Sequence, residues 1–237
     1  MRALTTAIRG LGELLITAGL VVLLFLAWQL WWTDLTAGRQ QEHITAQLEH
    51  SWGQPAASTP TSTPSAPGLG PAAGEKVPNT PGTAFAVIHV PRFGHDYARP
   101  VLQGVALDVL DKGVGHYPES PGPGAVGNFA VAGHRVTYAK PFNQIAELRK
   151  GDPVVIETKR YWYVYRVVSH LIVTPDRVDV IAPVPTHPGQ KPTERMMTMT
   201  ACHPEFSARE RYVVFSRLEQ RLPRVRGVVP DVLKKGA

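Results

Sequence analysis

Residues 195–217 read RMMTMTACHPEFSARERYVVFSR, and this stretch decides the fold class. Two runs within it, Arg195–Ala201 and Arg211–Arg217, are short, rich in apolar residues and show the alternation typical of half-buried strands. His203-Pro204 follows the first run, and proline cannot donate a ladder hydrogen bond. The stretch therefore predicts two strands, with Cys202 held at the end of the first.

The same pattern of short, apolar, strand-like runs extends back to Thr83. Five further short apolar runs are separated by turn residues: Phe85–Val90, Arg99–Gln103, Asn128–Ala132, Pro153–Thr158 and Trp162–Leu171. Helical signals in this region are few and short, at Leu107–Lys112 and Pro141–Arg149. Many short strands with sparse helices indicate an all-β barrel or sandwich with helical turns in its connections.

The N-terminal region has a different composition. Leu14–Trp32 reads LLITAGLVVLLFLAWQLWW, close to the ~20 apolar residues that a helix needs to cross a bilayer. Three tryptophans cluster at its end, where aromatic side chains favour the headgroup region. Arg2 and Arg9 precede it and Asp34 follows, so the N-terminus is expected in the cytoplasm. A cleavable signal peptide is the alternative, but the apolar segment is long and ends in tryptophan instead of small residues.

The remaining segments link and flank the globular part. Asp34–His50 is polar and is expected to continue as a short helix out of the membrane, whereas Ser51–Gly82 is dominated by Pro, Ser, Thr, Ala and Gly and indicates a flexible spacer. The basic C-terminus is interpreted as a solvated extension. The expected organisation is a cytoplasmic N-terminus (1–13), a transmembrane anchor (14–32), an extracytoplasmic spacer (33–82), a globular domain (83–220) and a basic tail (221–237).

The charge of the chain argues for an envelope partner. The 237 residues carry a formal net charge of +6, which nucleic-acid binding would also explain. No run of Lys and Arg interleaved with aromatic residues occurs, and the apolar segment places the domain outside the cytoplasm. We therefore expect no nucleic-acid partner, and a polyanionic cell envelope is the better match.

Cys202 is the single cysteine in the sequence, so no intramolecular disulfide is possible. A lone extracytoplasmic thiol is open to oxidation unless it is buried or has a use. The simpler interpretation is a small buried apolar residue. Its place at a strand end, before a loop that opens space in front of it, favours a nucleophile instead.

A nucleophilic cysteine needs a base, and the sequence has 9 histidines. His134 is the best candidate because it ends the strand-like segment VGNFAVAGHR, and Gly133 before it allows a sharp turn. His203 is adjacent to the cysteine, and neighbouring side chains diverge. His116, in a loop before Pro118, is expected to line the pocket.

An acyl-transfer intermediate also needs its oxyanion stabilised, and arginine supplies charge and forked donors together. Arg211 begins the last strand and shares a face with Val213 and Phe215. An arginine on an apolar face is costly without a purpose. Arg209, in the preceding loop, is better explained as solvated.

Two other kinds of chemistry compete with this one. Cys202, His203, His134 and His116 are potential zinc ligands, but their spacing fits no compact zinc pattern and only one thiolate is available. The 19 acidic residues show no arrangement that suggests glycoside cleavage. We expect no metal and no cofactor.

Three motifs resemble those of one family. Thr198-Met199-Thr200-Ala201-Cys202 resembles the Thr-Leu-x-Thr-Cys signature of sortases, and Gly133-His134-Arg135 resembles the segment with their catalytic histidine. Arg211 falls where their catalytic arginine begins the last strand. The segments GNFAVAGHR and ACHPEFSARERYVVF are most similar to class E sortases of actinobacteria. Met199 replaces the usual leucine, and Ala201 replaces a threonine.

The resemblance implies a closed eight-stranded barrel and a cysteine transpeptidase. Such an enzyme would cleave a Leu-Pro-x-Thr-Gly or Leu-Ala-x-Thr-Gly signal between Thr and Gly. Cys202 would form the thioacyl enzyme, His134 would transfer protons, and Arg211 would hold the oxyanion. Partners would be signal-bearing secreted proteins and the amine of a peptidoglycan precursor. Substrate contacts are expected at the following residues: His116, Tyr117, Thr200 and Ala201.

Two alternatives remain open at this point. A pilin-polymerising sortase would use a lysine side chain as the acceptor amine. A non-catalytic anchored domain would bind peptide or wall polymer on the same barrel and would leave Cys202 inert.

Overall fold

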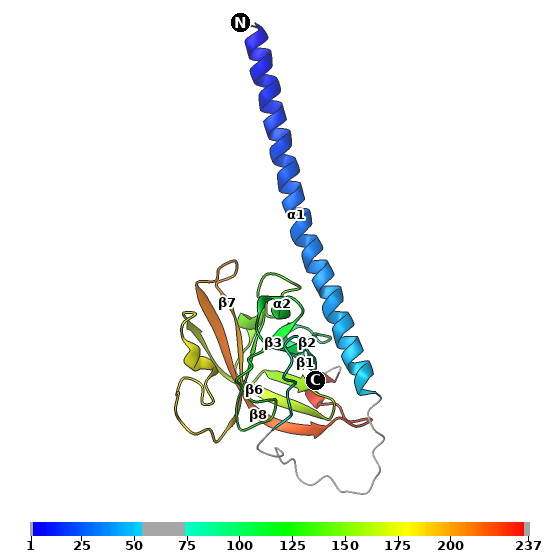
Figure 1. Cartoon of the computed structure of the whole chain (residues 1–237), viewed down its shortest axis with the longest axis vertical. Helices are drawn as coiled ribbons and strands as arrows, with labels where there is room; N and C mark the ends of the chain where they lie inside the picture. Colours follow the sequence, from blue (N-terminus) through cyan, green and yellow to red (C-terminus); the bar gives the residue numbers. More distant parts are fainter. Residues whose placement is uncertain (1, 54–73, 235–237) are drawn as a thin grey trace.

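The computed structural model describes residues 2–53 and 74–234 and consists of a closed β-barrel with a long helix along one side (Figure 1). The strands are β1 Ala84–His89, β2 Ala98–Gln103, β3 Val114–His116, β4 Gly127–Ala132, β5 Pro153–Glu157, β6 Tyr161–Val173, β7 Arg195–His203 and β8 Glu210–Pro223. The helices are α1 Arg2–Trp52, α2 Leu107–Leu110 and the 3-10 turns η1 Pro91–Phe93, η2 Ile145–Glu147, η3 Val178–Ile181 and η4 Asp231–Leu233.

The strand order around the barrel is β1-β2-β3-β4-β7-β8-β6-β5. β7 lies between β4, to which it runs parallel, and β8, to which it runs antiparallel. The predicted all-β barrel is confirmed, and all seven expected strands occur, although β8 extends six residues past its predicted end at Arg217. β3 was not predicted, and the expected helix over 141–149 is only the turn η2.

Alternation along β7 separates the core from the functional face. Met197, Met199 and Ala201 belong to the main hydrophobic core inside the barrel. Successive side chains of a strand point to opposite faces, so Thr198, Thr200 and Cys202 share the other face. The strand that anchors the core therefore also presents the cysteine outside it.

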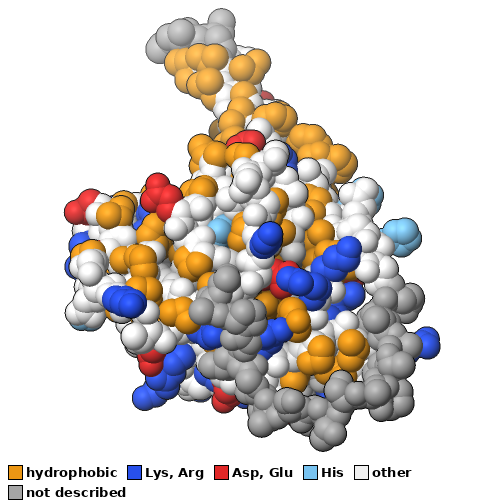
Figure 2. Space-filling view, turned by 60° about the horizontal axis from the view of Figure 1, so that its bottom comes forward, with side chains coloured by type: hydrophobic (Ala, Val, Ile, Leu, Met, Phe, Trp, Pro, Cys, Tyr) orange, Lys and Arg blue, Asp and Glu red, His pale blue; other side chains and the backbone are white. Residues whose placement is uncertain are grey.

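The N-terminal half of α1 is exposed and apolar. It is long and apolar enough to cross a membrane, and hydrophobic side chains cover it where it projects from the barrel (Figure 2). The C-terminal half instead packs on β1 and β2. Its buried side chains, Ala37, Gln41 and Thr45, are spaced four residues apart and so lie on one helix face. The predicted short helix after the apolar segment is thus the direct continuation of that segment.

This arrangement differs from the spacer expected over residues 33–82. Its first part is helical and docked, and residues 54–73 lie outside the described part of the chain. Residues 74–82 also pack on the barrel, because the Glu75 backbone N–H donates to Pro123 (2.9 Å) and that of Gly82 donates to Gln103 (2.7 Å). These residues pack through backbone hydrogen bonds and have few apolar side chains. Their composition therefore did not reveal that they are ordered on the barrel.

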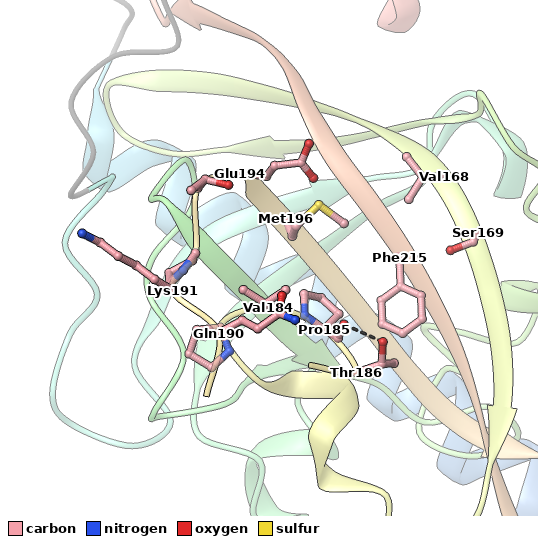
Figure 3. Close-up of a pocket in the computed structure, with 13 residues that line it drawn as sticks. Val168, Ser169, Val184, Pro185, Thr186, Gln190, Lys191, Glu194, Met196 and Phe215 are labelled. Atoms are coloured by element: carbon pink, nitrogen blue, oxygen red, sulfur yellow. Dashed lines mark hydrogen bonds between the residues drawn. The ribbon is translucent and has the colours of Figure 1, made fainter. Parts of the chain in front are cut away.

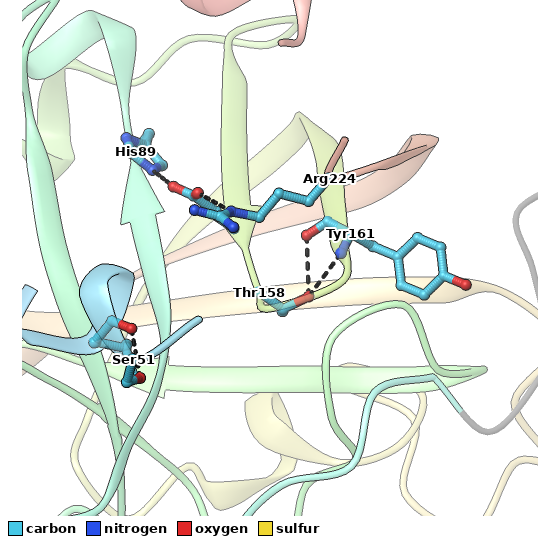
Figure 4. Close-up of polar contacts among 7 residues, drawn as sticks. Ser51, His89, Thr158, Tyr161 and Arg224 are labelled. Atoms are coloured by element: carbon cyan, nitrogen blue, oxygen red, sulfur yellow. Dashed lines mark hydrogen bonds and ion pairs between the residues drawn. The ribbon is translucent and has the colours of Figure 1, made fainter. Parts of the chain in front are cut away.

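The start of the expected basic tail is also structured. Arg224 donates to the buried Glu157 at 2.6 Å, and His89 contacts the same carboxylate at 3.0 Å (Figure 4). The guanidinium of Arg221 lies 3.6 Å from the ring centroid of Tyr161. These two arginines are therefore structural side chains, and the solvated interpretation is wrong for them.

Candidate active site

Cys202 and Arg211 face each other across two strands. They are directly paired in the antiparallel β7–β8 ladder. Side chains at opposed positions lie on the same face, with Cβ atoms about 5 Å apart. Both line a cavity of about 300 Å³, and His134 lines the same cavity. The structure therefore brings together the three residues that the sequence singled out.

His134 follows the end of β4 at a sharp turn. The backbone N–H of Gly133 still bonds to the Thr200 carbonyl (3.1 Å), which fixes the turn beside the nucleophile strand. A Cβ at position 133 would lie 2.7 Å from a ring carbon of Phe142, so only glycine fits there. Packing against Phe142 therefore explains why a glycine precedes the histidine.

The imidazole of His134 is held on two sides. Its Nε2 lies 3.2 Å from a carboxylate oxygen of Asp111, at the end of α2, and the Tyr138 ring lies 5.3 Å away, centroid to centroid. A proton on Nε2 that bonds to Asp111 leaves Nδ1 with the lone pair in the neutral ring. Sequence reasoning missed Asp111 because an acidic residue at the end of a short helix has no distinguishing pattern.

The turn that follows His134 has an unusual backbone. Tyr138, Ala139 and Lys140 have φ values of 51°, 60° and 50°. Three successive side-chain-bearing residues in the left-handed region carry a conformational cost, so surrounding contacts must hold them. Gln41 of α1 donates to the Tyr138 carbonyl at 2.9 Å, and Asp34 pairs with Lys140 at 2.7 Å.

Arg135 connects the histidine turn to the cysteine. Its buried guanidinium donates through Nη1 to Nδ1 of His203 at 2.8 Å and to the Cys202 carbonyl at 3.4 Å. Sequence reasoning included Arg135 only as part of the Gly-His-Arg segment and gave it no role. Arg135 therefore links the turn after β4 to the end of β7 at the site.

Three of the four expected substrate contacts lie at the cavity. The Tyr117 hydroxyl is 3.1 Å from the Thr200 hydroxyl, and both residues line the cavity. Tyr117 also lines a hollow of about 530 Å³ beside η3, so the two spaces adjoin. Ala201 borders the cavity too, although its side chain belongs to the core.

His116 is not at the cavity, and the prediction that it lines the pocket is wrong. It lies in β3 and is buried, with Nδ1 donating to Gln103 at 2.7 Å and Nε2 accepting from Ser120 at 2.8 Å. Its ring stacks on Phe129. Burial lowers the pKa of His116 to about 4. β3 is only three residues long, so it shows no alternation from which the inward orientation of this histidine could be predicted.

A separate hollow of about 350 Å³ lies between β6, β8 and the loop before β7 (Figure 3). Val168, Pro185 and Phe215 contribute apolar walls, whereas Lys191 and Glu194 border it. None of the candidate catalytic residues lines it. Among the described residues, no cluster of three or more His, Cys, Asp or Glu side chains is arranged to hold a metal ion.

Known proteins resemble this chain over most of its length. A family model described as the sortase domain matches residues 88–219. Sortase SrtE1 of Streptomyces coelicolor is 37% identical over 98% of this chain and 62% of its own length. The chain thus spans less than two thirds of that relative. Sortase SrtE2 of the same organism is 33% identical, over 92% of this chain and 84% of the relative.

Solved structures agree with the sequence comparison. The crystal structure of sortase E1 from Streptomyces coelicolor, with a tripeptide in its active site, superposes with a TM-score of 0.60 at 38% identity. The match covers 66% of this chain and 100% of that one.

Proposed function

This chain belongs to the sortase family of transpeptidases, and we propose that it is a membrane-anchored enzyme that uses Cys202 as its nucleophile. The observation that carries the proposal is the shared cavity of Cys202, His134 and Arg211, with the cysteine and arginine directly opposed. A thiol, an imidazole and a guanidinium are together sufficient for acyl transfer.

The first half of the reaction forms a thioacyl enzyme. His134 takes up the Cys202 thiol proton, and the thiolate attacks the threonine carbonyl carbon of a Leu-Pro-x-Thr-Gly-like or Leu-Ala-x-Thr-Gly-like signal. Arg211 stabilises the resulting oxyanion. When the C–N bond breaks, His134 gives its proton to the glycine amine, which leaves as a neutral amine. With Nε2 bonded to Asp111, this proton would be carried by Nδ1.

The second half reverses these roles. An acceptor amine, which we propose belongs to a cell-wall peptide, attacks the thioester carbonyl. His134 takes up the proton of that amine, the C–S bond breaks, and Cys202 is released as the thiolate. The product is a new amide bond between the two proteins or peptides.

Tyr117 and Thr200 are proposed to contact the signal peptide. Their hydroxyls lie at the cavity wall, and Tyr117 separates it from the adjoining hollow beside η3. Replacing Tyr117 with Ala is expected to change the ratio of kcat/KM for signals with Ala and with Pro at the second position. An unchanged ratio would remove Tyr117 from signal recognition.

Membrane anchoring is proposed from α1. Its apolar stretch is exposed and matches the length of a bilayer crossing. An exposed apolar surface of that size is unfavourable in water, so a membrane is its natural surrounding.

The test follows cleavage of a fluorogenic signal peptide, with a small amine as acceptor, by the full chain in detergent. Cys202→Ala is expected to abolish cleavage. His134→Ala is expected to lower kcat/KM by roughly 10²–10⁴-fold and Arg211→Ala by roughly 10²–10³-fold. Arg209 is exposed on the β7–β8 connection, two residues before Arg211, so Arg209→Ala is the matched control and should retain activity. Cleavage that survives Cys202→Ala would exclude this mechanism.

A further inference from the structure

We propose that the end of the barrel around the active-site cavity is a membrane-contact surface, in which Phe206 inserts among the lipid headgroups. The surface is defined by Phe206, Lys140 and Arg209. The inference rests on the membrane anchoring contained in the proposed function, and it assigns a role to side chains that the reaction does not use.

The apolar stretch of α1 ends directly beside the barrel. Trp31 and Trp32 are exposed at the end of the apolar stretch, where tryptophan favours the headgroup level. Asp34, only two residues later, already pairs with Lys140 of the barrel. At 1.5 Å rise per residue, the separation along the helix is roughly 3 Å. The barrel therefore begins directly beneath the headgroups.

The position of the barrel relative to α1 is fixed. α1 is continuous from the apolar stretch to Trp52, without a break that would let the barrel swing. Gln41 is wholly buried against the Tyr138 carbonyl, and a Cβ at Gly38 would lie 3.7 Å from that of Ala139. One end of the barrel is thus held toward the membrane.

Phe206 lies at that end of the barrel. Asn143 bonds through its backbone to Lys140 (3.0 Å) and through its side chain to Glu205 (3.4 Å). Phe206, next to Glu205, is 87% exposed and is the most exposed large apolar side chain of the described residues. The β7–β8 connection and α2 lie at the end of the barrel toward the projecting part of α1 (Figure 1).

The side chains around Phe206 suit the membrane interface. Arg209, on the same connection, is exposed, whereas Lys140 pairs with Asp34 (2.7 Å) and Glu205 pairs with Arg135 (3.8 Å). An exposed aromatic side chain near a basic one is typical of interfacial membrane binding, in which the arginine can contact lipid phosphates. The cavity with Cys202 would then open at the membrane surface, where a membrane-held substrate is presented.

The experiment uses the full chain in vesicles of phosphatidylcholine and phosphatidylglycerol, with Cys202→Ser so that one introduced cysteine is the only thiol. An environment-sensitive fluorophore is attached to F206C, and quenching by lipids brominated near the headgroup is measured. L24C, within the apolar stretch, reports on anchoring. K159C is the control, because Lys159 shares a hollow with Ser51 and Trp52. That hollow lies 18 residues, or roughly 27 Å, along α1 from Asp34.

We expect quenching at positions 24 and 206 and none at 159. Quenching at 24 without quenching at 206 would overturn this inference while leaving the anchor intact. Absence of quenching at 24 would instead contradict the anchor of the proposed function, and with it this inference. A blue shift at 206 that brominated lipid does not quench would show contact with another protein surface and would also overturn it.

Activity gives a second readout. In the parent enzyme, Phe206→Ser is expected to leave cleavage of a soluble signal peptide unchanged and to lower cleavage of a vesicle-tethered one severalfold. Val229→Ser, at an exposed apolar residue beyond the far end of β8, should change neither rate. Equal rates for Phe206→Ser and Val229→Ser on the tethered peptide would contradict the proposal.

Discussion

At the scale of single residues, His116 and His134 have opposite surroundings although both looked like pocket residues in the sequence. His134 borders an open cavity and contacts the Asp111 carboxylate. His116 is enclosed between Gln103 and Ser120, and burial lowers its pKa to about 4 from an ordinary value near 6.5. The folded barrel therefore prefers a neutral His116.

This preference makes the stability of the barrel depend on pH. Below pH 6.5 the unfolded chain binds a proton at His116 and the folded chain does not, so stability falls as the pH drops from 6.5 toward 4. The complete loss in the free energy of unfolding over this pH range corresponds to ~3 kcal/mol. Thermal unfolding at several pH values should show that His116→Gln loses less stability on acidification than the parent. His187→Gln, at an exposed histidine, should keep the parent's dependence, and an equal loss in all three proteins would refute the assignment.

Those site residues that stand out by residue type and by their place in a strand could be predicted from the sequence. Cys202 is unique and ends a strand, His134 follows a glycine, and Arg211 opens the last strand on its apolar face. Asp111 and Arg135 could not be predicted, because their roles depend on contacts between segments distant along the chain.

At the scale of elements, α1 and the turn after β4 form one unit. The side chain of Gln41 is wholly buried and donates to the Tyr138 carbonyl in the left-handed turn beside His134. Gln41→Ala leaves that carbonyl unpaired, which costs roughly 1–3 kcal/mol. We expect kcat for the soluble signal peptide to fall severalfold with KM nearly unchanged, because the turn positions a proton-transfer group.

The matched control is the adjacent position of the same helix. Gln40 is exposed, so Gln40→Ala removes the same side chain without touching the turn. Its kinetics in detergent should equal those of the parent. Indistinguishable kcat values for the two variants would show that α1 does not support the catalytic histidine.

A buried ion pair holds the C-terminal segment on the barrel. The side chains of Arg224 and Glu157 are 9% and 6% exposed. Arg224→Ala would leave Glu157 with only His89, and loss of one partner of a buried pair costs about 3–5 kcal/mol. Arg217, which pairs with Glu194 on the surface of β8, should cost less than ~1 kcal/mol when changed to Ala. Chemical denaturation measures both, and similar losses would refute a structural role for the tail.

The elements themselves were predictable to different degrees. Long alternating runs such as β6 and β7 were evident from the sequence, whereas β3 was too short to show a period. Residues 74–82 were misread because their packing uses backbone hydrogen bonds, which composition does not reveal.

At the scale of the whole molecule, the single cysteine reports on topology. If the apolar part of α1 spans the membrane with the N-terminus inside, Cys202 lies outside the cell. A membrane-impermeant maleimide should then label the chain in intact cells, and Cys202→Ala should abolish the label. Labelling that requires permeabilised cells would contradict the orientation.

Intact-mass measurement of the acid-quenched enzyme shows whether Cys202 carries the acyl group. After incubation with a signal peptide and no acceptor amine, we expect a mass increase equal to the peptide up to its threonine, located on Cys202. Added amine should discharge the adduct. An adduct on another residue, or peptide cleavage by Cys202→Ala, would exclude Cys202 as the nucleophile.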